Sequence, residues 1–207
     1  MIAAALAAAS RLVSGSTVHW HCDPRDARQR IYFANHASHL DFIVIWSALP
    51  PALRASVRPV AGRDYWEKGA VRQYLADRVF HAVLIERAVA GSADSLSRAR
   101  ASIKRMADEM EDRYSLIVFP EGTRGVNGQL GPFKSGLYYL SRARPDVELV
   151  PVYLDNLNRI LPKGEILPVP MLSRVVFGRP LAAGPNDDKH EFLTRARDAL
   201  IQLRAAP

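Results

Sequence analysis

The sequence predicts a single α/β domain in which helices flank a mostly parallel, mixed central sheet. Short apolar runs rich in β-branched residues alternate with longer helical segments along the chain, and this alternation is typical of a sheet covered by helices. The 207 residues can bury a core without disulfides or metals. No repeat, low-complexity tract or interdomain linker divides them, so we assign residues 1–207 to one domain whose motif-bearing core spans about residues 30–180.

The elements follow from local pattern and from turn residues between the patterns. The predicted strands are Ser16–His21, Arg30–Ala34, Ser56–Ala61, Ala82–Ile85, Leu116–Phe119, Glu148–Tyr153 and Arg174–Phe177. The predicted helices are Asp41–Leu49, Tyr65–Arg78, Ser92–Arg113, Lys134–Arg142 and Asp188–Arg204. Proline and glycine cluster in residues 122–132 and 161–170, which predicts two loops.

Residues 1–15 are apolar and alanine-rich, and they allow two interpretations. They form either a short helix at a membrane interface or an N-terminal helix that is packed or frayed. No stretch of the chain reaches the ~18 consecutive apolar residues of a spanning helix. The apolar run also lacks a preceding basic segment, so we expect no cleaved signal peptide.

The net charge of +7 points to an anionic partner. The arginines are scattered and no nucleic-acid-binding motif accompanies them, so we expect no nucleic acid. An anionic membrane surface or a phosphorylated substrate fits better, and a basic solvated surface without a partner fits equally well. Cys22 is the single cysteine and no Cys/His cluster has zinc spacing, so we expect no disulfide, no metal and a reducing, cytoplasmic compartment.

The first candidate for chemistry lies between a predicted strand and a predicted helix. His36 and Asp41 are five residues apart, and on one continuous helix they would point about 140° apart. They can meet if His36 lies in the turn and Asp41 opens the helix. The carboxylate would then fix one ring nitrogen and leave the other as a general base. Ser38 and Asp41 also fit a variant of the capping box, a structural role compatible with the first, while His39 lacks an equally placed acid.

The second candidate follows the strand Leu116–Phe119. Pro120 ends the strand, Gly122 permits a tight turn, and Arg124 offers a bidentate donor for phosphate. Glu121 has three open roles: it could hold the turn, bind an acceptor hydroxyl or neutralise Arg124. If both strands run parallel, the two candidate motifs share one edge of the sheet, where ligands of α/β proteins bind.

These residues resemble the signature blocks of the glycerolipid acyltransferases, the family typified by 1-acylglycerol-3-phosphate acyltransferase. The similar segments are His36-x4-Asp41, Phe119–Arg124 and Val150–Tyr153. Val83–Arg87 resembles the remaining block more loosely, because Glu86 stands where the family usually has aspartate and the usual preceding glycine is missing. That departure leaves the acceptor open.

The resemblance implies transfer of a fatty acyl group from an acyl-CoA or acyl-carrier-protein thioester to a lysolipid hydroxyl, with 1-acylglycerol-3-phosphate as the expected acceptor. It implies a peripheral membrane enzyme without a cofactor, in which Cys22 is dispensable. Val150–Tyr153 would be a strand near the acyl pocket or ordinary core. The implied catalytic residues are His36 and Asp41, and the implied substrate-binding residues are Arg63, Arg87, Glu121, Gly122, Thr123 and Arg124. The alternatives are another acceptor such as a lyso-ornithine lipid, a thioester hydrolase, and a non-catalytic peripheral membrane protein.

Overall fold

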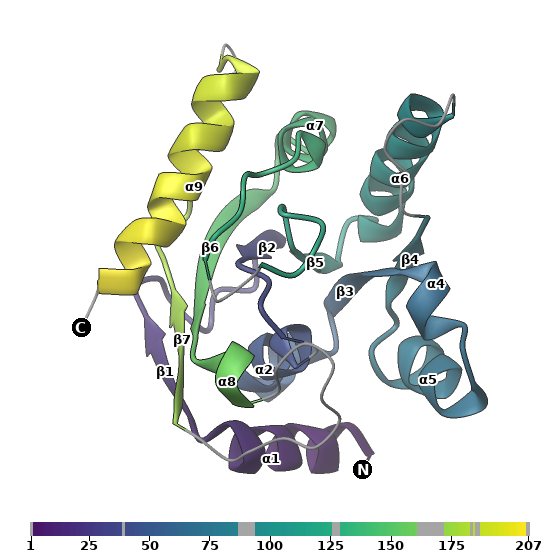
Figure 1. Ribbon diagram of the computed structural model, residues 1–207, viewed down its shortest axis with the longest axis vertical. Coiled ribbons are helices and arrows are strands. Elements are labelled where there is room, and N and C mark those ends of the chain that lie inside the picture. Colours follow the sequence, from purple (N-terminus) through teal and green to yellow (C-terminus); the bar gives the residue numbers. More distant parts are fainter. Residues whose placement is uncertain are drawn as a thin grey trace.

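The computed structural model describes residues 2–38, 40–86, 94–125, 129–160, 172–182, 184 and 187–205. In this part of the chain a seven-stranded sheet lies between two layers of helices (Figure 1). The elements in chain order are α1 (Ile2–Ser14), β1 (Ser16–Trp20), β2 (Arg30–Ala34), α2 (Asp41–Ala48), α3 (Pro51–Arg54), β3 (Val57–Gly62), α4 (Arg63–Trp66), α5 (Ala70–Tyr74), the π-helical turn η1 (Leu75–Val79), β4 (Val83–Ile85), α6 (Ser95–Met110), β5 (Ser115–Val118), α7 (Gly136–Ala143), β6 (Glu148–Asp155), α8 (Leu157–Ile160), β7 (Ser173–Phe177) and α9 (Lys189–Ala205).

The sheet is mixed but mostly parallel, as predicted. Its strand order is β1-β7-β6-β2-β5-β3-β4. The run from β6 to β4 is parallel throughout. β7 pairs antiparallel with β6, and β1 runs parallel to β7. The carboxyl ends of β2, β5, β3 and β6 therefore meet at one edge of the sheet.

The alternation of side chains along β2 connects the sheet to both helical layers. Ile31 and Phe33 belong to the core shared with α6, α7 and α9. Tyr32 and Ala34 belong to the core shared with α1 and α2 on the opposite face. Every residue of β2 is buried, so the strand that leads to His36 is held on both faces.

One predicted helix is wrong. The segment Tyr65–Arg78 is not continuous but forms α4, α5 and η1. Gly69 interrupts it with φ +93°, in the left-handed region that favours glycine. The four-residue helices α3 and α8 were not predicted because they are too short to show a helical period. Ser92, where the third predicted helix begins, lies outside the described residues, as does the predicted loop 161–170.

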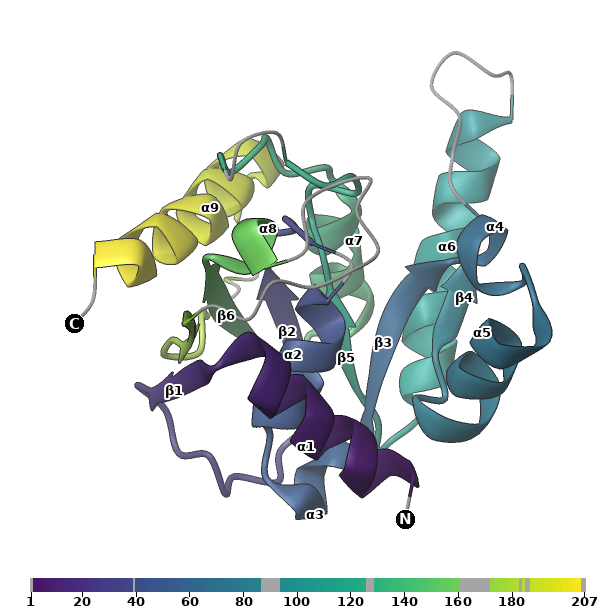
Figure 2. The same cartoon turned by 60° about the horizontal axis from the view of Figure 1, so that its bottom comes forward.

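The N-terminal segment is a packed helix. Ala7 is buried, and Arg11 Nε donates to the carbonyl oxygen of Ser47 in α2 at 3.0 Å. Figure 2 shows α1 lying across the layer that contains α2. Within the described residues no helix has both the length and the apolar character needed to cross a bilayer.

A buried arginine anchors the start of β2. Arg30 is only 1% exposed, and its guanidinium reaches Asp26 Oδ2 at 2.8 Å and Glu148 Oε2 at 3.1 Å. Hydrogen bonds from Arg28, together with the charge of Arg30, hold the pKa of Asp26 well below its usual range. Such a carboxylate stabilises the fold above its unfolded-state pKa, near 3.9 for Asp, and this contribution disappears as pH falls further.

We therefore expect the free energy of unfolding to fall between pH 5 and about pH 3, and to fall less in Asp26→Asn. Urea unfolding followed by circular dichroism at the two pH values measures both differences. Asp108→Asn on α6 is the matched control. Asp108 forms an exposed ion pair with Lys104, and such pairs contribute little to the free energy of unfolding. An equal pH dependence in the wild type and in Asp26→Asn would contradict the assignment.

Candidate active site

The two candidate motifs follow neighbouring parallel strands. Ile31, Tyr32 and Phe33 of β2 pair in register with Leu116, Ile117 and Val118 of β5. The chain leaves both strands at the same edge, so the His36 segment and the Glu121 segment lie side by side, as predicted.

His36 and Asp41 meet across the turn between β2 and α2. His36 Nδ1 lies 2.8 Å from Asp41 Oδ2. Asp41 is the first residue of α2 and is fully buried, whereas the His36 side chain is 22% exposed. The carboxylate selects the tautomer that carries its proton on Nδ1. None of the described residues hydrogen-bonds Nε2, which leaves this nitrogen available as a base.

Asp41 also organises the turn that carries His36. Its Oδ2 accepts the amides of Ala37 at 2.6 Å and Ser38 at 2.9 Å. This is the acidic half of the expected capping box. The other half differs from the prediction, because the Ser38 hydroxyl accepts from Leu40 N at 3.3 Å, one residue before α2 begins. His39 lies outside the described residues.

The second motif clamps His36 in three ways. The imidazole stacks on the Phe119 ring, with centroids 4.3 Å apart. His36 N donates to Glu121 Oε1 at 2.8 Å, and His36 O accepts from Gly125 N at 2.7 Å. Ring and backbone are therefore both fixed by residues that follow β5.

Glu121 connects loops rather than neutralising an arginine. The residue is 5% exposed, and its Oε2 accepts from Gly131 N at 2.7 Å. Each carboxylate oxygen thus binds one backbone amide. Among the described residues Glu121 forms no ion pair with Arg124, so the structure shows the turn-holding role. Direct binding of an acceptor by Glu121 stays a prediction.

Gly122 turns the chain between Glu121 and the exposed Thr123. Its φ is +69° and its amide donates to Phe119 O at 3.0 Å. A Cβ at this position would lie 2.8 Å from Lys134 Nζ, so the ammonium group of Lys134 covers the turn. No sequence signal pointed to Lys134, because an exposed lysine before a helix is common on protein surfaces.

Gly122→Ala is expected to destabilise the fold by about 1–2 kcal/mol, because alanine disfavours positive φ, and to reduce activity by displacing Lys134. Urea unfolding and a turnover assay measure the two effects. Gly136→Ala is the matched control: it begins α7 and has open space around its Cβ position, so stability should hold or rise. Equal stability of both variants would contradict the assigned role of the Gly122 turn.

The predicted arginines fall in different places. Arg124 is partly buried, and its Nη1 is buried without a hydrogen-bond partner. Arg63 opens α4 at the carboxyl end of β3, two strands from β2, and its Nη1 contacts Glu67 Oε1 at 2.6 Å. Arg87 lies outside the described residues. The structure therefore places Arg124 within the second motif and Arg63 farther along the same edge.

A cavity of about 300 Å³ opens at His36. Sequence reasoning missed its wall from α9, because two arginines and an isoleucine on a helix resemble an ordinary solvated face. Tyr153 of the predicted acyl-pocket strand lines the cavity, whereas Val150 and Val152 are core residues. Burial raises the pKa of the Tyr153 hydroxyl, while Arg204 acts in the opposite direction. The residues that line the 300 Å³ cavity include His36, Glu121, Tyr153, Arg197, Ile201 and Arg204.

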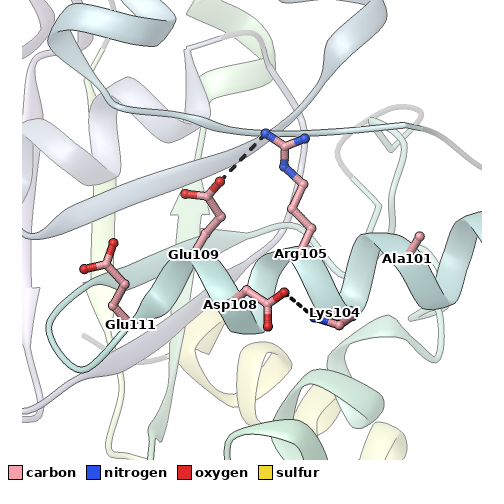
Figure 3. A pocket seen from close by; sticks show the side chains of 6 residues that line it. All are labelled: Ala101, Lys104, Arg105, Asp108, Glu109 and Glu111. Atoms are coloured by element: carbon pink, nitrogen blue, oxygen red, sulfur yellow. Dashed lines mark hydrogen bonds and ion pairs between the residues drawn. The ribbon is translucent and has the colours of Figure 1, made fainter.

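A larger hollow of about 570 Å³ runs along the exposed side of α6 and contains none of the predicted site residues. Figure 3 shows Lys104 paired with Asp108 and Arg105 with Glu109, while the remaining acid, Glu111, pairs with Arg113 outside the hollow. Lys104 contacts Asp108 at 2.6 Å and Arg105 contacts Glu109 at 3.8 Å. These charges are already compensated, so the smaller cavity at His36 is the better candidate. The described residues contain no cluster of three or more metal-ligating side chains.

Comparison with known proteins adds independent evidence. A protein-family model described as Acyltransferase matches residues 17–155. A 1-acyl-sn-glycerol-3-phosphate acyltransferase of Limnanthes alba is 30% identical over 154 residues, which cover 70% of this chain and 48% of that protein. The Saccharomyces cerevisiae protein of the same name is 26% identical over 183 residues, 83% of this chain and 54% of that protein.

The chain therefore spans about half the length of the curated relatives it matches. PlsC from Thermotoga maritima, described as a 1-acyl-sn-glycerophosphate acyltransferase, superposes with a TM-score of 0.68 at 18% identity. This match covers 97% of this chain and 79% of PlsC, and it shows a shared fold. Because the family model covers most of the chain and includes both motifs, the protein belongs to the Acyltransferase family.

Proposed function

We propose that this protein transfers a fatty acyl group from an acyl thioester to the free hydroxyl of 1-acylglycerol-3-phosphate, giving phosphatidate. The observation that carries the proposal is the 2.8 Å contact between His36 and the buried Asp41, clamped against the Glu121–Arg124 turn. The names of the relatives support the choice of acceptor.

His36 acts as the general base in this mechanism. Nε2 takes the proton of the acceptor hydroxyl while its oxygen attacks the thioester carbonyl carbon. The tetrahedral intermediate then collapses: the carbon–sulfur bond breaks, the ester forms, and the imidazolium returns the proton to the departing thiolate. Asp41 remains ionised and stabilises the imidazolium. Atoms and charge balance without a cofactor.

A covalent acyl-enzyme is unnecessary, because the thioester is already activated. The one cysteine is also poorly suited to such a role. Burial raises the pKa of the Cys22 thiol, and the thiolate is the nucleophilic form. Cys22 follows β1, which lies three strands from β2 in the sheet order. Direct attack by the acceptor oxygen is therefore the simpler route.

Arg124 is the proposed ligand for the acceptor phosphate. A buried guanidinium nitrogen without a partner is costly, and a phosphate oxygen would supply the missing acceptor. Arg63, at the same edge, and Arg87 are proposed to contribute further positive charge. The donor in this proposal is either an acyl-CoA or an acyl-carrier protein, which share the thioester chemistry.

The function is tested by incubating the purified protein with palmitoyl-CoA and a panel of lysolipids while thiol release and lipid product are measured together. We expect equal amounts of thiol and phosphatidate with 1-acylglycerol-3-phosphate, and little thiol without an acceptor. Thiol release that does not need an acceptor would instead identify a thioester hydrolase. Product formed only from an uncharged lysolipid or a lyso-ornithine lipid would refute the proposed acceptor.

We further propose that the protein works at an anionic membrane surface in the cytoplasm, where such an acceptor resides. The net charge of +7 supports this. So does α1, on which Ile2 and Leu12 are 50% and 82% exposed although the helix packs on α2.

Leu12→Asp is expected to weaken binding to vesicles that contain phosphatidylglycerol, because it places a negative charge on the proposed contact surface. Vesicle co-sedimentation measures the bound fraction. Leu96→Asp is the matched control, since Leu96 on α6 is 74% exposed and lies outside that surface. Equal binding by both variants would exclude α1 as the contact.

A further inference from the structure

The cavity at His36 has a wall that lies beyond the region matched by the family model. That match ends at residue 155, whereas α9 begins at Lys189. Arg197, Ile201 and Arg204 of α9 line the cavity together with His36. They occupy positions i, i+4 and i+7, so they share one side of the helix. The C-terminal helix is thus part of the candidate active site.

The buried residues of α9 determine which way the side with Arg197, Ile201 and Arg204 faces. Phe192, Ala196, Leu200 and Leu203 are buried in the core shared with the sheet. At 3.6 residues per turn the cavity-facing side lies roughly 110° around the helix from this buried side. Figure 1 shows α9 running beside β6, the strand that carries Tyr153. The two arginines are therefore presented from a rigid element and not from a loop.

The arginines of this side carry uncompensated charge. Arg195, on another side of the same helix, pairs with Asp187. By contrast, no carboxylate of the described residues lies within ion-pairing distance of Arg197 or Arg204. Within the described part of the chain, the hydrogen bond of the Arg197 guanidinium goes from Nη2 to the carbonyl oxygen of Leu130, at 3.3 Å. The Glu121 carboxylate also lines the cavity, but each of its oxygens already accepts a backbone amide.

The other walls are part apolar and part polar. Leu130, Tyr153 and Ile201 supply the apolar and aromatic surface, and Asn35, Gln129 and Glu121 supply the polar surface. Such a mixture of two guanidinium groups with apolar walls suits an elongated ligand that carries phosphate, since guanidinium groups bind phosphate oxygens in bidentate geometry. Arg197 and Arg204 are about 10 Å apart along the helix axis, so they can contact separate parts of one ligand.

We propose that this cavity is a phosphate-binding subsite for a substrate of the acyl transfer, with Arg197 and Arg204 as its ligands. The proposal rests on the proposed function. The phosphate can come from the phosphopantetheine arm of the acyl donor or from the headgroup of the acceptor. Arg124 does not line this cavity, so the fold offers phosphate contacts in two places, as a reaction between two phosphate-bearing substrates requires.

Equilibrium binding tests the subsite without turnover. Isothermal titration with coenzyme A, and separately with glycerol 3-phosphate, is run on the wild type and on the double variant Arg197→Gln/Arg204→Gln. We expect at least tenfold weaker binding of one probe by the double variant, with partial recovery in Arg197→Lys/Arg204→Lys. Arg100→Gln/Lys189→Gln is the matched control for the loss of two positive charges, since both residues are exposed and neither lines the cavity. Unchanged binding of both probes, or an equal loss in the control, would overturn the proposal.

Kinetics then identifies the source of the phosphate. A rise of KM for palmitoyl-CoA, but not for the phosphate-free analogue palmitoyl-pantetheine, assigns the subsite to the donor. A rise of KM for 1-acylglycerol-3-phosphate alone assigns it to the acceptor. If the wild type binds a probe through these arginines but transfers no acyl group, the proposed function fails while the subsite stands. If it transfers acyl groups and the double variant keeps both KM values, the subsite fails alone.

Discussion

Replacing His36 by alanine is expected to slow acyl transfer by about 10²- to 10⁴-fold, the usual contribution of a positioned general base. The stacked contact with Phe119 is lost, but the backbone bonds of residue 36 to Glu121 and Gly125 do not depend on the imidazole. The variant should therefore keep its fold. Thiol release in the presence of the acceptor measures turnover, and far-ultraviolet circular dichroism with a thermal melt checks folding.

Two further variants make this result specific. Asp41→Asn keeps the volume of the side chain but removes the charge that stabilises the imidazolium, so it should also lose most turnover. His190→Ala is the matched control, since His190 is an exposed residue of α9 that does not line the cavity. Near-wild-type turnover in His36→Ala would refute the mechanism. Equal losses in His36→Ala and His190→Ala would show a nonspecific effect of histidine removal.

The parts of this site that sequence could predict are those fixed by neighbours along the chain. The apolar run of β2 ends at Ala34, and the helical pattern of α2 starts at Asp41. That short separation leaves His36 in a turn, from which Asp41 is within reach. The same logic placed the second motif after β5. Two parallel strands then bring both motifs to one edge, a consequence of topology that needs no side-chain detail.

The parts that could not be predicted depend on contacts between distant residues. The hydrogen bonds of Glu121 to His36 and Gly131 need the closed loops, so its turn-holding role was only one of three open roles. Arg197 lies far from His36 in the sequence. The spacing of Arg197, Ile201 and Arg204 is also that of an ordinary solvent-facing side of a helix. Gly69 interrupts the predicted helix Tyr65–Arg78 through its positive φ. The sequence did not predict this break, because a glycine within a helical pattern does not reveal its φ.

Glu121→Ala is expected to combine a loss of stability with a loss of turnover. The amides of His36 and Gly131 would each lose their acceptor, and an unsatisfied buried amide costs about 1–3 kcal/mol. The backbone of His36 would also lose one of its fixed contacts. A displacement of about 1 Å at a catalytic group can cost roughly 10²-fold in rate. Urea unfolding and steady-state kinetics measure the two losses.

The division between kcat and KM separates the two remaining roles of Glu121. If Glu121 only positions His36, replacing it should lower kcat and stability together and leave the KM for the lysolipid nearly unchanged. If Glu121 binds the acceptor hydroxyl, Glu121→Gln should raise this KM while its stability stays close to wild type.

The glutamine of Glu121→Gln keeps one oxygen for the His36 amide but turns a donor toward Gly131 N. We therefore expect Glu121→Gln to fall between Glu121→Ala and wild type in both stability and kcat. Glu191→Ala, an exposed acid in the first turn of α9, is the matched control. A raised KM with unchanged stability would show that Glu121 binds substrate and that its bonds to the two backbone amides contribute little to stability.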